Sequence, residues 1–514
     1  MVTTNRTGRG AATGAGAASR ARAGLHGQRL RRGDRRVARG SLPAPCGGTG
    51  RTFGGVATAL AAFTAGGRPF GCQRLRRAGN GAVAALLLAA CSMQPAAPEV
   101  TVATVAAAGA THPTVAVDPA SGAVYVAWVG VPGADGRADV FLARSDDGGA
   151  TYAAPIRVND VPGDAAPHAQ APAQVAVGPD GTVYVVWQNN TKIEGRRFPA
   201  SDLRLARSRD GGRTFEPAVY VNDDAGGPPA SHTFHDVAVL PDGTVLVSWI
   251  DGRVRAAAEA AHAGGSGAST GSARNGSPAA SGGPAHHGVQ GVPEEPSSQI
   301  RVARSLDGGR TFGPSVVVAE QACPCCRTSL AVGPAGEVYL AWRAVFAGSI
   351  RDVVVARSDD GGRSFRPAIP VHDDGWRLDA CPHAGPSLAV DAEGRLHAAW
   401  FTGVEGRAGV FHAVSTDGGR SFRGPHALAR ADVVAPSLAK LDAAGGAVWV
   451  AWEDRTSPER RLRVGHARNG GAPRAFDVAL GPGVAPALAA TDDLAVVVWL
   501  EEEAVRSAAL RWER

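Results

Sequence analysis

The chain has 514 residues, of which 53 are basic and 47 acidic, so its formal net charge is +6. Residues 1–80 contain 15 arginines and a single acid, Asp34, whereas the rest of the chain carries a net charge of −8. The high pI therefore gives no support to nucleic-acid binding by that larger part. Hydrophobic residues make up 44%, which excludes wholesale disorder, and 68 glycines with 35 prolines favour β-structure rich in turns.

Residues 81–90 are uncharged and apolar, follow a group of arginines at 74–77, and precede Cys91. This order is typical of a secretory signal, and ten residues are too few to span a bilayer, which needs about 20. Leu88-Ala89-Ala90-Cys91 resembles the lipobox of bacterial lipoproteins, which implies cleavage before Cys91 and lipidation of that cysteine. We therefore predict that residues 1–91 are a leader with a lipoprotein signal. The mature protein is expected in the cell envelope, anchored to a bacterial membrane and facing the periplasm or the exterior.

One octapeptide, Ser-x-Asp-Gly-Gly-x-Ser/Thr-aromatic, recurs five times, and residues 468–471 form a degenerate sixth copy. Asp accepts backbone N–H bonds and glycine adopts positive φ, so the pattern predicts a hairpin turn whose closing aromatic packs on the sheet. It resembles the Asp box, or bacterial neuraminidase repeat, which implies a fold and no particular activity. The aspartates of the five copies are Asp147, Asp210, Asp307, Asp360 and Asp417.

Seven tryptophans close similar apolar runs along the chain: Trp128, Trp187, Trp249, Trp342, Trp400, Trp452 and Trp499. Each run follows another short strand, and in the first six repeats a third strand, an Asp box or its remnant, and a fourth strand come after it. Four strands in a repeat of about 50–60 residues predict the blades of a propeller.

The seventh repeat has only three strands, at 486–490, 494–499 and 504–510, and residues 98–102 match the fourth strands of other repeats. Joining these segments closes the ring and removes an open sheet edge. We therefore predict an all-β, seven-bladed propeller over 92–514, closed by an N-terminal strand; six blades, as in sialidases, are the alternative. Residues 256–297, rich in Gly, Ala and Ser, are predicted to be a flexible loop inserted in the third blade.

The loops that lead into the first strands, called here the first-strand loops, carry histidine or cysteine in five successive blades. First strands line a propeller's channel, so these side chains are expected to converge at its mouth. Cys and His bind Zn, Cu or haem iron, so we predict a transition-metal site, with copper or zinc as the ion. The candidate ligands are His112, His168, His235, Cys323, Cys325, Cys326, Cys381 and His383.

Disulfide bonding is the alternative for these cysteines, because thiols of exported proteins tend to pair or to bind metal. Four cysteines allow three pairings. A bridge from the fourth blade to Cys381 is favoured over a strained link between Cys325 and Cys326.

Charged residues follow the tryptophans and join the same mouth. Guanidinium groups clamp carboxylates or phosphates, and acids beside them serve as general acid or base. The pattern therefore predicts a small anionic ligand, with salt bridges between blades as the alternative. The candidate residues are Asp251, Arg253, Arg327, Arg343, Glu453 and Arg455.

Residues 100–512 resemble sialidase-like proteins, which implies a glycan ligand and, in active members, three arginines on the substrate carboxylate, a Tyr nucleophile aided by Glu, and an Asp acid/base. The family's Phe/Tyr-Arg-Ile-Pro motif is absent, and the five tyrosines occupy framework positions. Fold does not imply function. Three hypotheses therefore stay open: a mouth that binds a metal or an anionic ligand, a glycoside hydrolase or glycan-binding module of the exo-α-sialidase type, and a protein-interaction scaffold in the cell envelope.

Overall fold

The computed structural model describes residues 98–131, 133–134, 137–194, 199–264, 298–430, 439–455, 461–468, 470–475 and 480–511. The leader and the lipidation candidate Cys91 lie outside these residues. Within the described ranges, no helix is both long enough and apolar enough to cross a bilayer.

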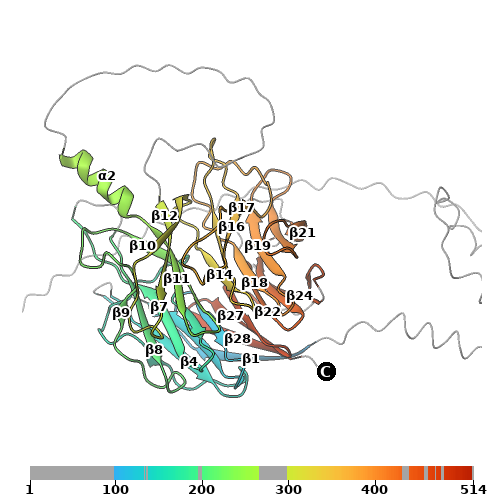
Figure 1. Ribbon diagram of the computed structural model, residues 1–514. Helices are drawn as coiled ribbons and strands as arrows, with labels where there is room; N and C mark the ends of the chain where they lie inside the picture. The colour runs from blue at the N-terminus through green and yellow to red at the C-terminus, as the bar shows by residue number, and fades with distance from the viewer. Residues whose placement is uncertain are drawn as a thin grey trace, which may run out of the picture. The chain divides into compact units, whose positions relative to one another are not determined.

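The described chain forms seven antiparallel four-stranded sheets, the blades of a propeller (Figure 1). Blade 1 contains β2 (Thr114–Val117), β3 (Val124–Val129), β4 (Val140–Ser145) and β5 (Ile156–Arg157). Blade 2 contains β6 (Gln174–Val177), β7 (Val183–Gln188), β8 (Leu203–Ser208) and β9 (Val219–Tyr220). Blade 3 contains β10 (His232–Val239), β11 (Val245–Asp251), β12 (Ser298–Ser305) and β13 (Val316–Ala322).

The remaining blades repeat this order, so the predicted count of seven is confirmed. Blade 4 contains β14 (Ser329–Val332), β15 (Val338–Arg343), β16 (Val353–Ser358) and β17 (Ile369–Pro370). Blade 5 contains β18 (Ser387–Val390), β19 (Leu396–Thr402), β20 (Gly409–Ser415) and β21 (Arg423–Arg430). Blade 6 contains β22 (Ala439–Ala444), β23 (Ala447–Asp454), β24 (Arg461–Arg468) and β25 (Arg474–Ala475).

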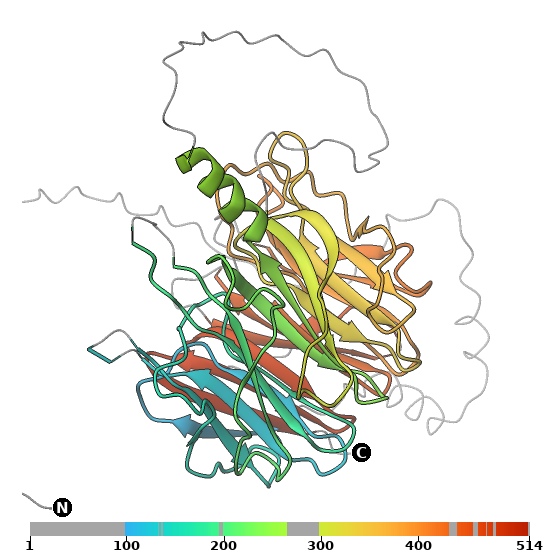
Figure 2. The ribbon, with the colours of Figure 1, turned by 60° about the vertical axis from the view of Figure 1, so that its left-hand side comes forward.

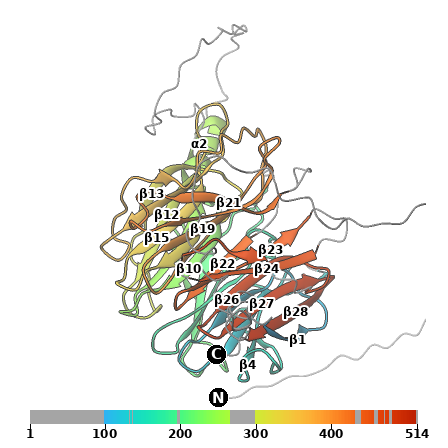
Figure 3. The ribbon, with the colours of Figure 1, turned by 90° about the vertical axis from the view of Figure 1, so that its right-hand side faces the viewer.

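The seventh blade is built from both ends of the propeller, as predicted. Its strands β26 (Val484–Ala490), β27 (Leu494–Glu501) and β28 (Ala504–Arg511) are completed by β1 (Glu99–Ala106). The register of β1 on β28 runs antiparallel from Glu99 opposite Arg511 to Ala106 opposite Val505. Figure 3 shows β1 beside the last strands of the chain. This pairing leaves β28 without an open edge.

The second strand of each blade is buried, and its side chains pack against the neighbouring blade. In β3, β7, β11, β15 and β19 every residue is buried. Trp187 of blade 2, for example, lies in one apolar cluster with Val129 and Val140 of blade 1. Large aromatic side chains contribute most to such packing because they remove the most apolar surface from water.

The Asp boxes form hairpin turns held by their own side chains. In the first copy, the Asp147 carboxylate accepts the backbone N–H and the hydroxyl of Thr151 at 2.9 and 2.6 Å, and the Ser145 hydroxyl at 2.7 Å. These bonds lower the pKa of Asp147 to about 2. The Asp147 side chain therefore holds the backbone of its own turn in place.

An arginine on the third strand of one blade links it to the Asp box of the next. Arg207 donates to the carbonyl of Gly308 at 2.5 Å, and its Nε donates to Glu216 at 2.9 Å. Equivalent bonds join Arg144 to Gly211 and Arg357 to Gly418. We call this recurring contact the arginine latch.

The framework tyrosines support the same turns. A Cβ placed on Gly309, whose φ is +81°, would lie 3.0 Å from the ring of Tyr184, and one on Gly212 would lie 3.2 Å from Tyr125. Each ring is thus covered by the Asp-box glycine of the next blade. This packing explains why these tyrosines are buried and why they occupy one repeated position.

Helix α2 (Arg253–Gly264) extends from the end of β11 in blade 3 (Figure 2). The prediction of a loop from residue 256 is therefore wrong up to residue 264. Alanine has the highest intrinsic helix propensity, and six alanines stand in this segment. The remainder of the predicted loop, residues 265–297, lies outside the described ranges.

Replacing Arg207 by Ala is expected to destabilise the propeller by about 1–3 kcal/mol, because charge-assisted hydrogen bonds to Gly308 and Glu216 are lost. Urea unfolding followed by tryptophan fluorescence measures the change. Arg209→Ala, two residues further along and exposed, is the matched control and should leave the midpoint unchanged. Equal midpoints for the two variants would contradict a stabilising latch.

Candidate metal centre at the channel mouth

Three buried cysteines lie together at the start of blade 4. Cys323 directly follows β13, and Cys325 and Cys326 belong to the turn that leads towards β14. Their Sγ atoms are 3.5 Å (Cys323–Cys325), 3.6 Å (Cys323–Cys326) and 4.0 Å (Cys325–Cys326) apart. We call these three residues the thiol triangle.

The thiol triangle has the dimensions of a metal-binding set. Zinc binds thiolates at about 2.3 Å in tetrahedral geometry, which separates two sulfurs by about 3.8 Å. All three observed separations lie within a few tenths of an ångström of that value. All four cysteines of the described chain are free thiols, so the structure contains no bridge from blade 4 to Cys381.

Two further ligands approach from the first-strand loop of blade 5. Cys381 and His383 are exposed, and with Cys325 they offer ligand atoms that all lie within 4.8 Å of one another. His383 has φ +50°, the left-handed region in which a non-glycine residue is strained. Such strain is concentrated at functional sites, where the surrounding structure maintains it. Cys325 thus belongs to two sets of ligands from neighbouring blades.

Arg343 fixes the position of the blade 5 loop. Its fully buried guanidinium donates to the carbonyls of Ala384 at 2.9 Å, Phe401 at 2.7 Å and Arg351 at 2.6 Å. It also lies 5.0 Å from the centroid of the Trp376 ring. Arg343 therefore anchors the loop that carries Cys381 and His383, rather than presenting its charge to the channel.

Arg351, which sequence reasoning missed, joins the two cysteine-bearing loops. Its Nη1 donates to the Cys323 Sγ at 3.1 Å and its Nε donates to the Leu378 carbonyl at 2.6 Å. Hydrogen bonds with the Cys325 and Cys326 thiols, together with the charge of Arg351, lower the pKa of the Cys323 thiol. Burial instead raises the pKa of Cys326 to about 12.

The candidate histidines of blades 1 to 3 are kept neutral. Burial, aided by the charges of Arg327 and His168, lowers the pKa of His112 to about 4. Burial likewise lowers the pKa of His168, and His383 lowers it further. These mutual effects show that first-strand loops from blades 1, 2, 4 and 5 converge. The imidazoles nevertheless form no third cluster of metal-binding geometry among the described residues.

His235 packs behind these groups and is fully buried. Its Nε2 lies 3.2 Å from the carbonyl of Val186 in blade 2, and burial lowers its pKa to about 4. The structure therefore places His235 in the packing between blades 2 and 3.

The charged pairs after the tryptophans are bonded locally. Arg253 Nε donates to the Asp251 carboxylate at 2.9 Å and its Nη2 donates to Asp223 at 2.8 Å. Arg455 Nε donates to Glu453 at 2.8 Å, and the other Glu453 oxygen accepts from the backbone of Ala485 at 2.7 Å. Asp251 and Glu453 are buried. These residues hold loops together at the mouth.

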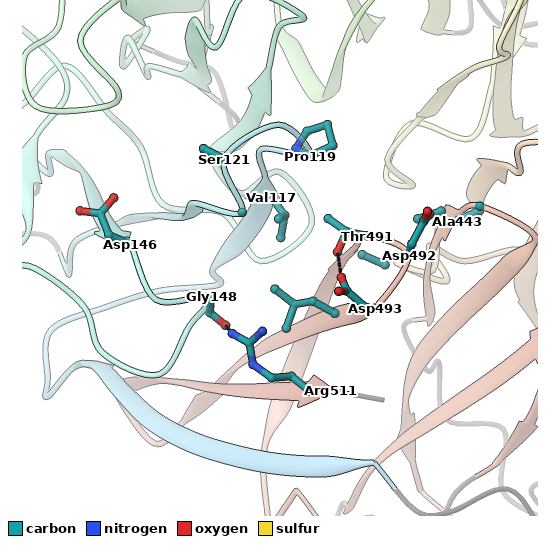
Figure 4. Close-up of a pocket in the computed structure, with 15 residues that line it drawn as sticks. Val117, Pro119, Ser121, Asp146, Gly148, Ala443, Thr491, Asp492, Asp493 and Arg511 are labelled. Carbon is teal, nitrogen blue, oxygen red and sulfur yellow. Dashed lines mark hydrogen bonds between the residues drawn. The ribbon is translucent and has the colours of Figure 1, made fainter. Parts of the chain in front are cut away.

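A separate cavity of about 730 Å³ opens at the face that carries the Asp boxes (Figure 4). It is lined by turns of blades 1, 6 and 7 and by none of the predicted site residues. Its carboxylates, Asp146, Asp492 and Asp493, are exposed, and Arg511 there points to the carbonyl of Gly148. The chemistry of the chain is thus concentrated at the opposite end of the channel.

No protein-family model and no curated protein matches the chain. Similar solved structures include a protein of unknown function from Dyadobacter fermentans (14% identity, 81% of this chain, 99% of the other, TM-score 0.45). Another is the Hadza microbial sialidase Hz136 (15% identity, 73% of this chain, 73% of the other, TM-score 0.41). A third is a family PL25 ulvan lyase (12% identity, 80% of this chain, 96% of the other, TM-score 0.48). With such identities and TM-scores below 0.5, these likenesses say nothing about the ligand or reaction of this chain.

The free energy of unfolding should decrease as the pH is lowered from about 6.5 to about 4. The reason is that His112 and His235 take up a proton in the unfolded chain at a higher pH than in the folded one. Their folded pKa values are depressed, so their contribution is complete above pH 6.5 and lost on acidification. Urea unfolding at a series of pH values in chelator measures the slope. His235→Asn should reduce it. A slope unchanged in His235→Asn would contradict the assignment.

Proposed function

We propose that this chain is an exported, lipid-anchored propeller that binds a thiophilic transition-metal ion, Zn²⁺ or Cu⁺, at its channel mouth. The single observation that supports this most directly is the thiol triangle, whose sulfur separations of 3.5–4.0 Å suit thiolates around one ion. Soft thiolate ligands select Cu⁺ and Zn²⁺ over the harder metals. The predicted export signal supports it further, since thiols outside the cytoplasm tend to pair or to bind metal.

Three thiolates leave one position of a tetrahedral ion open. Cys381 and His383 form a second ligand set with Cys325 alone, so a movement of the blade 5 loop, or an outside ligand, would complete the site. A metal held by three buried sulfurs and approached through two exposed ligands suits the acceptance and release of an ion from the envelope. Binding would also tie blade 4 to blade 5, because the ligands come from both first-strand loops.

Metal analysis of the purified full chain, reconstituted anaerobically with Zn²⁺ or Cu⁺, should give one tightly bound ion per chain. Cys326→Ser should lose most of this binding because it removes one corner of the thiol triangle. His383→Ala should weaken it by a smaller factor, and exposed His426→Ala should have no effect. A thiol titration in denaturant is the cross-check. If the native protein binds no metal and its cysteines are found in disulfides, the proposal is wrong.

Arg351→Met should weaken metal affinity about 10- to 100-fold, the range typical for loss of a group that orients a metal ligand. The reason is that the donor at 3.1 Å from the Cys323 sulfur is removed. Competition with a chromogenic chelator measures affinity, and Arg351→Lys, which can still donate, should restore part of it. Arg377→Met, exposed in the same loop region, is the control. Equal affinities for wild type and Arg351→Met would show that Arg351 does not position Cys323.

A further inference from the structure

Cys325 is a corner shared by two different sets of metal ligands. With Cys323 and Cys326 it forms the thiol triangle, whose sulfurs lie 3.5, 3.6 and 4.0 Å apart. With Cys381 and His383 it forms a second set, called here the outer set, whose ligand atoms all lie within 4.8 Å of one another. No larger group of these five residues meets that limit. An ion about 2.3 Å from each ligand spans at most about 4.6 Å, so the five residues as placed do not surround one ion.

The two sets differ in their access to solvent. Cys323, Cys325 and Cys326 are 0%, 4% and 1% exposed, so the thiol triangle is closed to water on most sides. Cys381 and His383 are both exposed. The shared sulfur of Cys325 therefore lies between a buried set of ligands and an open one.

The blade 5 loop is fixed on both sides of Cys381 and His383. Before them, Arg351 Nε donates to the carbonyl of Leu378 at 2.6 Å. After them, Arg343 Nη2 donates to the carbonyl of Ala384 at 2.9 Å. Both arginines belong to blade 4, the blade that also carries the thiol triangle. These bonds favour a second ion at the outer set over a movement of the loop onto the ion of the thiol triangle.

Gly385 lets the two cysteine-bearing loops touch. A Cβ at this position would lie 2.5 Å from the carbonyl oxygen of Arg327, the residue that follows Cys326. A side chain cannot come so close to a backbone atom without displacing it, and glycine is the residue that permits such an approach. The blade 5 loop is thus packed directly on the blade 4 loop, which holds the outer set next to the thiol triangle.

A thiolate sulfur has more than one lone pair and can bind two soft ions at once. Cu⁺ suits both sets, because thiolate ligands select it, imidazole also binds copper, and it accepts low coordination numbers. Two ions at about 2.3 Å from one sulfur lie no more than about 4.6 Å apart. The compact arrangement of the two sets around Cys325 is consistent with such a pair.

We propose that the channel mouth binds two Cu⁺ ions bridged by the Cys325 thiolate, an inner ion in the thiol triangle and an outer ion in the outer set. This inference rests on the proposed function, because Cys325 is a bridge only if the thiol triangle binds metal. The inner ion has three buried sulfur ligands and binds first. The outer ion has two exposed ligands, binds more weakly, and is the one that exchanges with ligands from solvent.

Native mass spectrometry of the reduced full chain, titrated anaerobically with Cu⁺, counts the ions. Wild-type protein should bind two. The double variant Cys381→Ser/His383→Ala should bind one, because only the outer set is removed. Asp373→Asn, an exposed change in the same loop, is the matched control and should still bind two. Melting temperatures of the metal-free variants check that each is folded.

Alkylation of Cys381 reports the order of filling. This thiol is exposed and should react with iodoacetamide in the metal-free protein. It should stay reactive after one equivalent of Cu⁺ and become protected after the second, as read by peptide mass spectrometry. Protection by the first equivalent would show that the blade 5 loop joins the inner ion, and the two-ion site would then be wrong.

Substitution of single cysteines tests the bridge itself. Cys325→Ser should weaken both ions by on the order of tenfold or more each, since loss of a ligand costs at least as much as loss of a supporting group. Cys326→Ser should weaken the inner ion and spare Cys381 protection by the outer one. An outer ion bound as tightly in Cys325→Ser as in wild type would overturn the bridge.

The two proposals fail in different ways. A wild-type chain that binds one ion, with the same affinity as the Cys381→Ser/His383→Ala variant, would overturn the two-ion site and leave the proposed function intact. A second ion that persists in that variant would lie elsewhere and would also overturn the outer set. A chain that binds no Cu⁺ and no Zn²⁺ would overturn the proposed function.

Discussion

The pairing of β1 with β28 is the contact on which the rest of the structure depends. Without it, blade 7 would consist of three strands and would end in an unpaired edge, which is prone to non-native pairing. Closing so long a chain costs little more entropy than closing a shorter one, since each doubling of length adds about 0.6 kcal/mol. Once the ring is closed, loops more than 100 residues apart meet at one mouth. The influence of Arg327 on His112 is one result.

Some residues recur at the same position in successive blades, whereas the residues at the channel mouth differ from blade to blade. The arginine latch, the Asp-box aspartates and the framework tyrosines recur from blade to blade, and each makes the same contact with its neighbour. The positions at the mouth do not repeat in this way. Blade 1 has an imidazole, blade 4 has three thiols and a guanidinium, and blade 6 has an amine. Repeated contacts thus provide a rigid ring, and variation is confined to the end of the channel where the ligands would bind.

The fold could be predicted because it rests on repeated patterns within the sequence. Strand alternation, closing tryptophans and Asp boxes each appear several times, so an error in one copy is corrected by the others. The charged mouth offered no such redundancy. Arg253 and Arg455 suggested a clamp, but each follows an acid by two residues, and the structure shows that each bonds that acid. This local pairing was readable from the spacing alone.

Other features of the mouth depend on tertiary contacts that no local pattern encodes. Arg343 was predicted to bind an anion at the mouth and Arg351 was not singled out, yet both orient the loops carrying the thiols because blade 5 lies beside blade 4.

The energetically unfavourable features of the chain also point to the channel mouth, independently of any sequence resemblance. Along the rest of the ring, buried arginines such as Arg207 and Arg343 donate to carboxylates or carbonyls, so their desolvation is offset. At the mouth, three thiols share one small volume and His383 adopts a strained backbone conformation. An ion among the sulfurs would offset the cost of holding the thiols so close together.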